Sequence, residues 1–115
     1  MSKTNTIGVD LAKNVFHPRI QDDKGHFIKQ VKLWRSQFNH FLATTQVSRV
    51  VFESCATSHY WNRVATHHGH QVALIHPAYV KPYLKTNKND FNDAEAICEA
   101  DSRPTMRYVN TKTIE

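Results

Sequence analysis

The sequence contains few of the residues that mark disordered, disulfide-bonded or membrane-spanning chains. Only three glycines and four prolines occur among its 115 residues, which is too few for a disordered or repetitive chain. The two cysteines, Cys55 and Cys98, form no CxxC motif, so we expect reduced thiols and a cytoplasmic location. No apolar run reaches the roughly 18 residues of a membrane span, and the first ten residues, MSKTNTIGVD, contain no apolar run of signal-peptide length. We therefore expect a soluble protein with no membrane partner.

The composition predicts one globular domain over residues 1–115. Hydrophobic residues make up 40% of the chain, and a domain of this length buries roughly two thirds of its unfolded surface, which is enough for a core. Fifteen Lys and Arg residues exceed ten Asp and Glu residues, giving a net charge of +5 and a pI of about 9.4. This excess favours a polyanionic partner such as nucleic acid.

The first third of the chain predicts an antiparallel meander. Residues 4–10 and 14–21 read as strands, and 26–33 returns as a third strand after the turn residues 22–25. Pro18 cannot donate to a sheet ladder, so we expect a local irregularity there.

The remainder predicts alternating helices and strands. The first helix carries Trp34, Phe38, Phe41 and Leu42 on its inner face, and the second carries Tyr60, Trp61, Val64 and Ala65 and stops at Gly69. Buried strands are expected at 48–54 and 70–76, a short helical or irregular stretch at 77–83, and a last helix from Asp90 that turns Ala94, Ile97 and Cys98 inward.

The predicted order is therefore β-β-β-α-β-α-β-α. It indicates an α/β fold with a mixed five-stranded sheet, helices on both faces, and the first strand parallel to the fourth. Ribonuclease H-like domains share this order.

Two acids occupy unusual places, since Asp10 and Glu53 each end an apolar strand. Neighbouring parallel strands would present both at one end of the sheet, and Asp90 and Asp93, one helical turn apart, could approach the same end. Such a cluster repels itself unless cations are bound. Mg²⁺ or Mn²⁺ suits these oxygen ligands, and two ions about 4 Å apart support phosphodiester displacement. The predicted chemistry is strand cleavage or transfer in nucleic acid.

Structural explanations compete with each of these assignments. Asp90 is a favoured helix N-cap, and Asp93 could be its capping-box partner. The histidines of HHGH (67–70) lie too close together for one tetrahedral zinc site. Cys55 and His59 lack a third orienting group for thiol catalysis. Basic side chains form a plausible phosphate-tracking set, although a solvated basic face is an equal explanation: Lys13, Lys81, Lys85 and Lys88.

Three segments carry a family resemblance: IGVDLAKNVF at 7–16, VVFESCATSHYWNR at 50–63 and KNDFNDAEAICEA at 88–100. In this order and spacing, the chain resembles the N-terminal domain of the DEDD transposases of the insertion-sequence one-ten family, which includes Piv-type DNA invertases. The resemblance implies a RuvC-like, ribonuclease H-related fold that binds divalent metal. By motif, its acidic tetrad falls on Asp10, Glu53, Asp90 and Asp93.

The resemblance also implies features beyond these residues. Family members continue into a C-terminal domain that supplies a serine nucleophile, so the chain is expected to be a fragment. Members act on DNA as oligomers, some with a structured guide RNA, and the isolated fragment is not expected to recombine DNA by itself.

Three rival functions fit parts of the sequence. A Holliday-junction resolvase of the same fold would use the same acids for hydrolysis without strand transfer. The segment IGVDLAK resembles the first phosphate loop of sugar kinases and actin-like ATPases, but that architecture needs glycine-rich phosphate loops, which this sequence lacks. A nucleic-acid-binding module without catalysis would use its acids only as helix caps.

Overall fold

The fold begins with a run of short strands and then alternates helices and strands. The computed structural model describes residues 4–12, 14–84 and 90–109, and of residues 90–92 it describes the backbone alone. The strands are β1 (Thr6–Val9), β2 (Val15–Phe16), β3 (Arg19–Gln21), β4 (Phe27–Gln30), β5 (Leu33–Trp34), β6 (Arg49–Glu53) and β7 (Gln71–Ile75). The helices are α1 (Arg35–Thr44), α2 (Ser58–His67), α3 (Pro77–Val80) and α4 (Asp90–Asp101), with the 3-10 turn η1 (Lys81–Tyr83) after α3.

Five of the strands form one mixed sheet in the order β4-β3-β1-β6-β7. β3 is antiparallel to both β4 and β1, whereas β1 pairs in parallel with β6, and β6 in parallel with β7. The prediction of a mixed five-stranded sheet, with the first strand parallel to the strand after the first helix, is therefore confirmed.

The predicted strands 14–21 and 26–33 are each split in two. Pro18 lacks the N–H that a continuous ladder requires, and its carbonyl accepts the N–H of Val31 (3.2 Å). The chain on one side of this bond continues the main sheet as β3 and β4, and on the other side β2 and β5 pair as a separate two-stranded ribbon. The irregularity expected at Pro18 is confirmed, but the single long strands were wrong.

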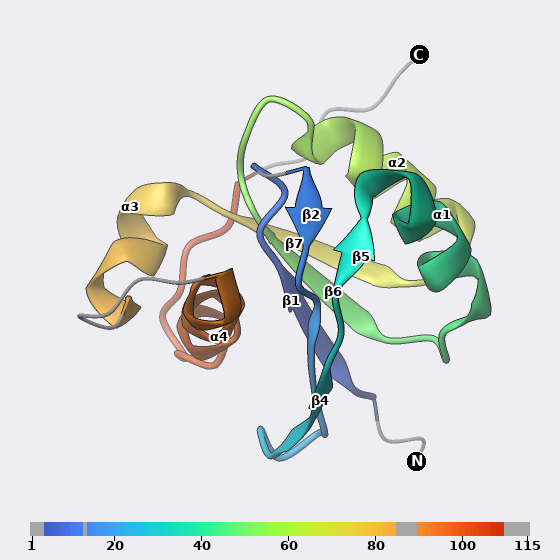
Figure 1. Cartoon of the computed structure of the whole chain (residues 1–115). Coiled ribbons are helices and arrows are strands. Elements are labelled where there is room, and N and C mark those ends of the chain that lie inside the picture. The colour runs from blue at the N-terminus through green and yellow to red at the C-terminus, as the bar shows by residue number, and fades with distance from the viewer. Residues whose placement is uncertain (1–3, 13, 85–89, 110–115) are drawn as a thin grey trace.

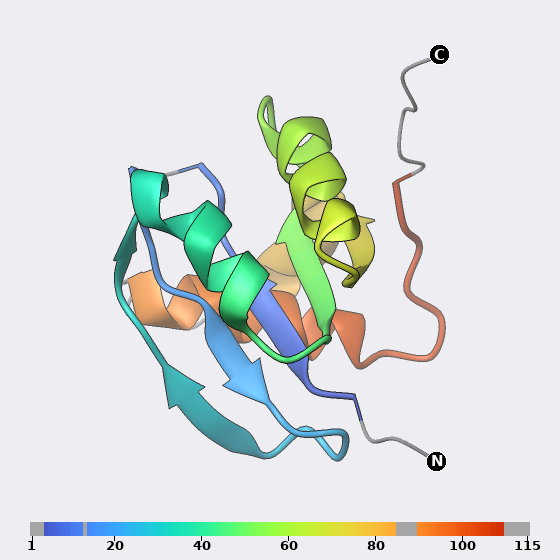
Figure 2. The same cartoon turned by 90° about the vertical axis from the view of Figure 1, so that its right-hand side faces the viewer.

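The helices cover both faces of the sheet. Figure 1 shows α1 and α2 on the right of the strands and α4 on the left; in Figure 2, which looks onto that right-hand side, α1 and α2 lie in front of the strands and α4 behind them. One buried cluster joins β1, β3 and β6 to α1 and α2, and a second joins β6 and β7 to α3 and α4. Within the described residues, no helix combines the length and apolar character needed to cross a membrane.

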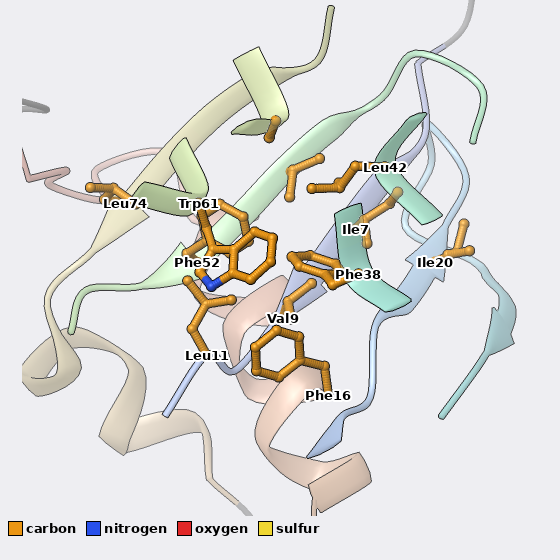
Figure 3. Packing of buried hydrophobic residues seen from close by; sticks show 12 residues of the cluster. Ile7, Val9, Leu11, Phe16, Ile20, Phe38, Leu42, Phe52, Trp61 and Leu74 are labelled. Carbon is orange, nitrogen blue, oxygen red and sulfur yellow. The ribbon is translucent and has the colours of Figure 1, made fainter. Parts of the chain in front are cut away.

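Aromatic rings fill the larger cluster, as Figure 3 shows. Phe38 meets Phe16 and Trp61 edge to face, with ring centroids 5.0 and 4.9 Å apart. Such pairs contribute about 0.5–1.5 kcal/mol beyond the burial of their area. These contacts attach α1 and α2 to each other and to the ribbon strand β2.

Two aromatic residues predicted to face inward are exposed instead. Trp34 is 61% exposed because it precedes the first helical turn in extended backbone conformation (φ −70°, ψ 152°), so the helical spacing to Phe38 does not apply. Tyr60 is 53% exposed, because the inner face of α2 is centred on Trp61 and Ala65. The inward prediction was wrong for both.

Helix α4 lies directly against β1 at Gly8. A Cβ atom added to Gly8 would meet Cys98 Sγ at 2.6 Å and the Ala94 carbonyl oxygen at 2.9 Å. The inward face of α4 is correspondingly small, and Ala94, Ile97 and Cys98 are buried as predicted. Cys98 is also a free thiol, as is Cys55.

We predict that Gly8→Ala lowers the free energy of unfolding by about 1–3 kcal/mol, because overpacking a filled contact forces the helix away from the strand. Urea denaturation measures this loss. The double variant Gly8→Ala/Cys98→Ala removes the nearer obstacle and should recover part of the loss due to Gly8→Ala. A Gly8→Ala protein as stable as the parent would show that α4 does not approach β1 this closely.

A second prediction concerns Cys98, whose thiol is 2% exposed. Burial raises the pKa of this thiol from its usual 9.0 to about 12. Above about pH 9 the unfolded chain therefore releases a proton that the folded chain retains, so stability falls as pH rises toward the folded pKa. Urea denaturation at about pH 8 and about pH 10 should show this fall, by up to about 1.4 kcal/mol per pH unit.

Comparison with variants isolates the thiol from other groups that titrate at high pH. Cys98→Ala should reduce the pH-dependent loss of stability, whereas Cys55→Ala, which removes the half-buried thiol, should leave the loss unchanged. Equal losses in the parent and in Cys98→Ala would contradict the prediction.

Candidate functional site

Asp10 and Glu53 lie at the same end of two adjacent strands. Val9 pairs with Phe52 in the parallel register of β1 and β6, so the residues that follow this pair are Asp10 and Glu53. Neighbouring strands run about 4.8 Å apart. The fold thus places the backbones of two acidic residues side by side, although they are 43 positions apart in the sequence (53 − 10).

Local hydrogen bonds hold the backbone at both positions. Asp10 is half-buried, and its Oδ1 accepts the backbone N–H of Ala12 (3.0 Å), which fixes the turn that leaves β1. After Glu53, which is also half-buried, the N–H of Ser54 donates to the Ile75 carbonyl (2.8 Å). The β6–β7 ladder therefore extends past Glu53 and positions its backbone.

Helix α4 carries the other two predicted acids. Asp93 is 9% exposed and immediately precedes Ala94, whose carbonyl oxygen faces Gly8, two residues before Asp10. The far end of the helix lies near the start of β6, because Asp101 binds Arg49. The N-terminal turn of α4 therefore lies away from the start of β6. Asp90 is the first residue of the helix, and its side chain lies outside the described residues.

The described side chains do not by themselves complete a metal cluster. Among them, no three His, Cys, Asp or Glu residues form a group that could hold a metal ion. The Asp90 side chain lies outside the described residues, so the four-residue set stays a prediction. Asp10 and Glu53 are the two members whose strands the structure places side by side.

A partly buried ionic network, which no sequence pattern indicated, fixes the C-terminal end of α4. Arg49 donates from Nε to Asp101 Oδ2 (3.0 Å) and from Nη2 to Asp101 Oδ1 (2.8 Å), and Tyr108 donates to the same Oδ1 (2.7 Å). Hydrogen bonding to Asp101 raises the pKa of the Arg49 guanidinium. Burial, followed by the bond to Asp101, raises the pKa of the Tyr108 phenol.

His76, which was not among the candidates predicted from the sequence, follows β7 at the same edge as the strand acids. Ile75 is in register with Glu53, so His76 is one residue beyond it on the neighbouring strand. Its Nδ1 accepts the N–H of Ala78 (3.1 Å) and caps α3, which places the ring proton of the neutral form on Nε2. An apolar run ending in His-Pro was the available sequence signal.

The remaining candidates have structural partners or are only partly described. Lys81 is exposed at the start of η1, and the other three predicted phosphate-binding residues lie outside the described residues: Lys13, Lys85 and Lys88. His70 is buried, accepts the Ser48 N–H through Nδ1 (3.1 Å) and donates from Nε2 to the Leu42 carbonyl (2.7 Å). One member of the HHGH tract is therefore a core residue that links α1 to β6.

Comparison with known proteins agrees with the family resemblance. A family profile of IS110-type DEDD transposases, described as "Transposase", matches residues 7–114. The transposase for insertion sequence element IS1328 of Yersinia enterocolitica is 47% identical over 113 residues, covering 98% of this chain and 34% of the relative. A probable family 20 transposase of Pseudomonas aeruginosa is 47% identical (95% and 32% covered), and the transposase for IS1111A of Coxiella burnetii is 43% identical (100% and 32%). The chain spans about a third of these relatives. No solved structure gives a significant match.

We predict that Arg49→Met lowers the free energy of unfolding by about 1–3 kcal/mol, because it leaves the Asp101 carboxylate, only 8% exposed, without its cation. Arg103→Met is the matched control, since Arg103 pairs with Glu99 at the surface, where both side chains are nearly half exposed. The control should cost less than about 1 kcal/mol. Equal losses in urea denaturation would show that the Arg49–Asp101 pair is no stronger than a surface pair.

Proposed function

The chain belongs to the DEDD transposase family, and we propose that it forms the catalytic-acid domain of such an enzyme. In this proposal, Asp10, Glu53, Asp90 and Asp93 bind divalent metal for cleavage and transfer of DNA strands. The supporting observation is the parallel register of β1 and β6, which presents Asp10 and Glu53 at one edge of the sheet.

The two strand acids suit Mg²⁺. This ion prefers oxygen ligands and is commonly held by one or two carboxylates, with waters and substrate phosphates completing its coordination. Adjacent parallel strands supply such a pair of carboxylates. Asp93 is next in sequence to Ala94, whose carbonyl contacts β1 at Gly8. The donor set therefore fits a magnesium or manganese site that is completed when DNA is bound.

The residues of this chain have separate roles in the proposed mechanism. A bound divalent cation would supply activation of a water or hydroxyl and stabilisation of the leaving oxygen. Asp10 and Glu53 would hold such ions from the sheet, and Asp90 and Asp93 from the helix. Gly8 lets α4 approach the sheet, and Arg49 fixes the far end of α4 through Asp101, so both are positioning residues.

A ribonuclease H-like fold is part of the same proposal. Its support is the sheet order, in which three antiparallel strands (β4, β3 and β1) are followed by two parallel strands (β6 and β7), each of which follows a helix. Helices on both faces and acids at the ends of β1 and β6 agree with this assignment.

The complete reaction is proposed for the longer protein, because this chain spans about a third of its relatives. The relatives are named transposases, which makes DNA the proposed substrate. Exposed Lys81 lies in η1, just after α3, and is proposed to contact the DNA backbone.

We predict that Mg²⁺ or Mn²⁺ raises the melting temperature, because a ligand that binds only the folded state stabilises it. With a dissociation constant of about 1 mM, about 10 mM metal adds about 1.4 kcal/mol, which corresponds to several degrees in a domain of this size. Asp10→Asn should abolish the rise. An asparagine retains the Oδ1 that accepts the Ala12 N–H, so the turn should survive the substitution.

Asp23→Asn is the charge-matched control, because Asp23 is exposed in the β3–β4 turn and is not a member of the predicted tetrad. This variant should keep the full metal-dependent rise. A melting curve that does not change with metal, or one that responds equally in Asp10→Asn, would favour a nucleic-acid-binding module without catalysis.

A further inference from the structure

The α1–α2 side of the sheet contrasts in charge with the α4 side. Neither α1 nor α2 contains an acidic residue, and between Asp23 and Asp90 the sequence has a single acid, Glu53. Helix α4 contains five acids: Asp90, Asp93, Glu95, Glu99 and Asp101. The sheet separates α1 and α2 from α4 (Figure 1), so the five acids of α4 lie on the opposite side of the molecule from α1 and α2. A polyanion that approaches α1 and α2 therefore meets no carboxylate from these two helices.

A groove of about 380 Å³ lies between α1 and α2 on this side. Its lining combines an aromatic ring, a guanidinium, two imidazoles, an amide and one apolar side chain: Tyr60, Arg63, His67, His68, Asn39 and Val64. Tyr60, Arg63 and His67 are spaced three and four residues apart, so they follow one side of α2 over about 10 Å. All three are exposed.

The groove is held in shape by contacts of its own residues. His68 Nε2 donates to Asn39 Oδ1 (2.8 Å), which ties α2 to α1. The Tyr60 ring meets buried Trp61 edge to face, with centroids 5.0 Å apart, so one side of the ring is braced by the core. Val64 packs against the same core. A binding surface that is ordered before its ligand arrives loses less entropy on binding.

We infer that this groove binds single-stranded DNA, with an unpaired base stacked on Tyr60 and the adjacent phosphate held by Arg63. Stacking on an aromatic side chain combined with a cationic path for the backbone is the chemistry by which proteins bind single strands. The choice of DNA rests on the proposed function. A second copy of this face is disfavoured as the occupant, because the contact would oppose two surfaces of the same charge.

The position of the groove relates it to the acids. α2 begins at Ser58, five residues after Glu53, and runs back along the sheet toward the start of β7. Tyr60 is therefore close to the beginning of α2, and His67 is at the helix end that lies away from the acids. A strand lying along α2 would lead toward the edge where β1 and β6 end.

Fluorescence anisotropy with a labelled single-stranded DNA of about 20 nucleotides, in EDTA, tests the inference. Tyr60→Ala and Arg63→Gln should each weaken binding about fivefold or more, since base stacking and phosphate contacts each contribute at this level. Tyr60→Phe keeps the stacking ring and should bind as the parent does. Lys24→Gln, in the exposed β3–β4 turn, removes one charge outside the groove and should change affinity less than twofold.

Several outcomes would overturn the inference. Variants at Tyr60 and Arg63 that keep their melting temperature and bind single-stranded DNA as tightly as the parent would exclude the groove. If RNA of the same sequence binds more tightly than the single-stranded DNA, and Tyr60→Ala weakens this binding, DNA is excluded as the occupant. Tighter binding of the duplex, insensitive to Tyr60→Ala, would exclude base stacking.

The same proteins separate this inference from the proposed function. Binding in EDTA does not depend on metal, and Tyr60→Ala should retain the Mg²⁺-dependent rise in melting temperature. A parent protein that binds DNA through the groove but shows no such rise would overturn only the metal site. If the parent protein shows the metal-dependent rise but its Tyr60 and Arg63 variants bind DNA as tightly as the parent does, only the groove is overturned.

Discussion

The close contact between α4 and β1 at Gly8 is the constraint on which the proposed site depends. A hydrogen atom in place of a side chain lets the Ala94 carbonyl and the Cys98 thiol lie against the strand. The Arg49–Asp101 pair fixes the same helix at its C-terminal end. Two attachments at different points along α4 restrict both its distance from the sheet and its sliding along it. The position of the first turn of α4, which carries Asp90 and Asp93, therefore follows from residues outside that turn.

The sheet also separates two chemical environments. On the α4 side, acidic residues pair with Arg19 and Arg49, which belong to the sheet itself. On the other side, α1 and α2 present arginine, histidine and amide groups over an aromatic core. The net charge of +5 does not express this asymmetry, because half of the ten acids that offset the basic residues belong to α4. A nucleic acid approaching the molecule would therefore meet ion-paired carboxylates on the α4 side and none from α1 and α2 on the other.

The sequence contained enough information to predict the main sheet and the strand acids, because both depend on local pattern and on the rules of strand connection. Period-two apolar runs, the turn at 22–25 and the helical spacing of α4 are all local signals. The exposure of Trp34 was not predictable from spacing, because it depends on the residue at which α1 starts. The Arg49–Asp101 pair joins residues 52 positions apart, and no periodicity relates two such distant side chains. His76 joins the acid edge only through the register of β6 and β7.

The division of the predicted tetrad between sheet and helix has a consequence for how metal would act. Asp10 and Glu53 belong to strands that are tied together by a backbone ladder, so their separation is set without any ion. Asp90 and Asp93 belong to a helix that meets β1 at Gly8, packs against β6 and β7, and is attached at its far end through Asp101. A cation shared by the two pairs would therefore attach the start of α4 to the sheet edge. Since carboxylates that share a site repel one another until a cation neutralises them, metal binding and the seating of this turn would be coupled, and each would stabilise the other.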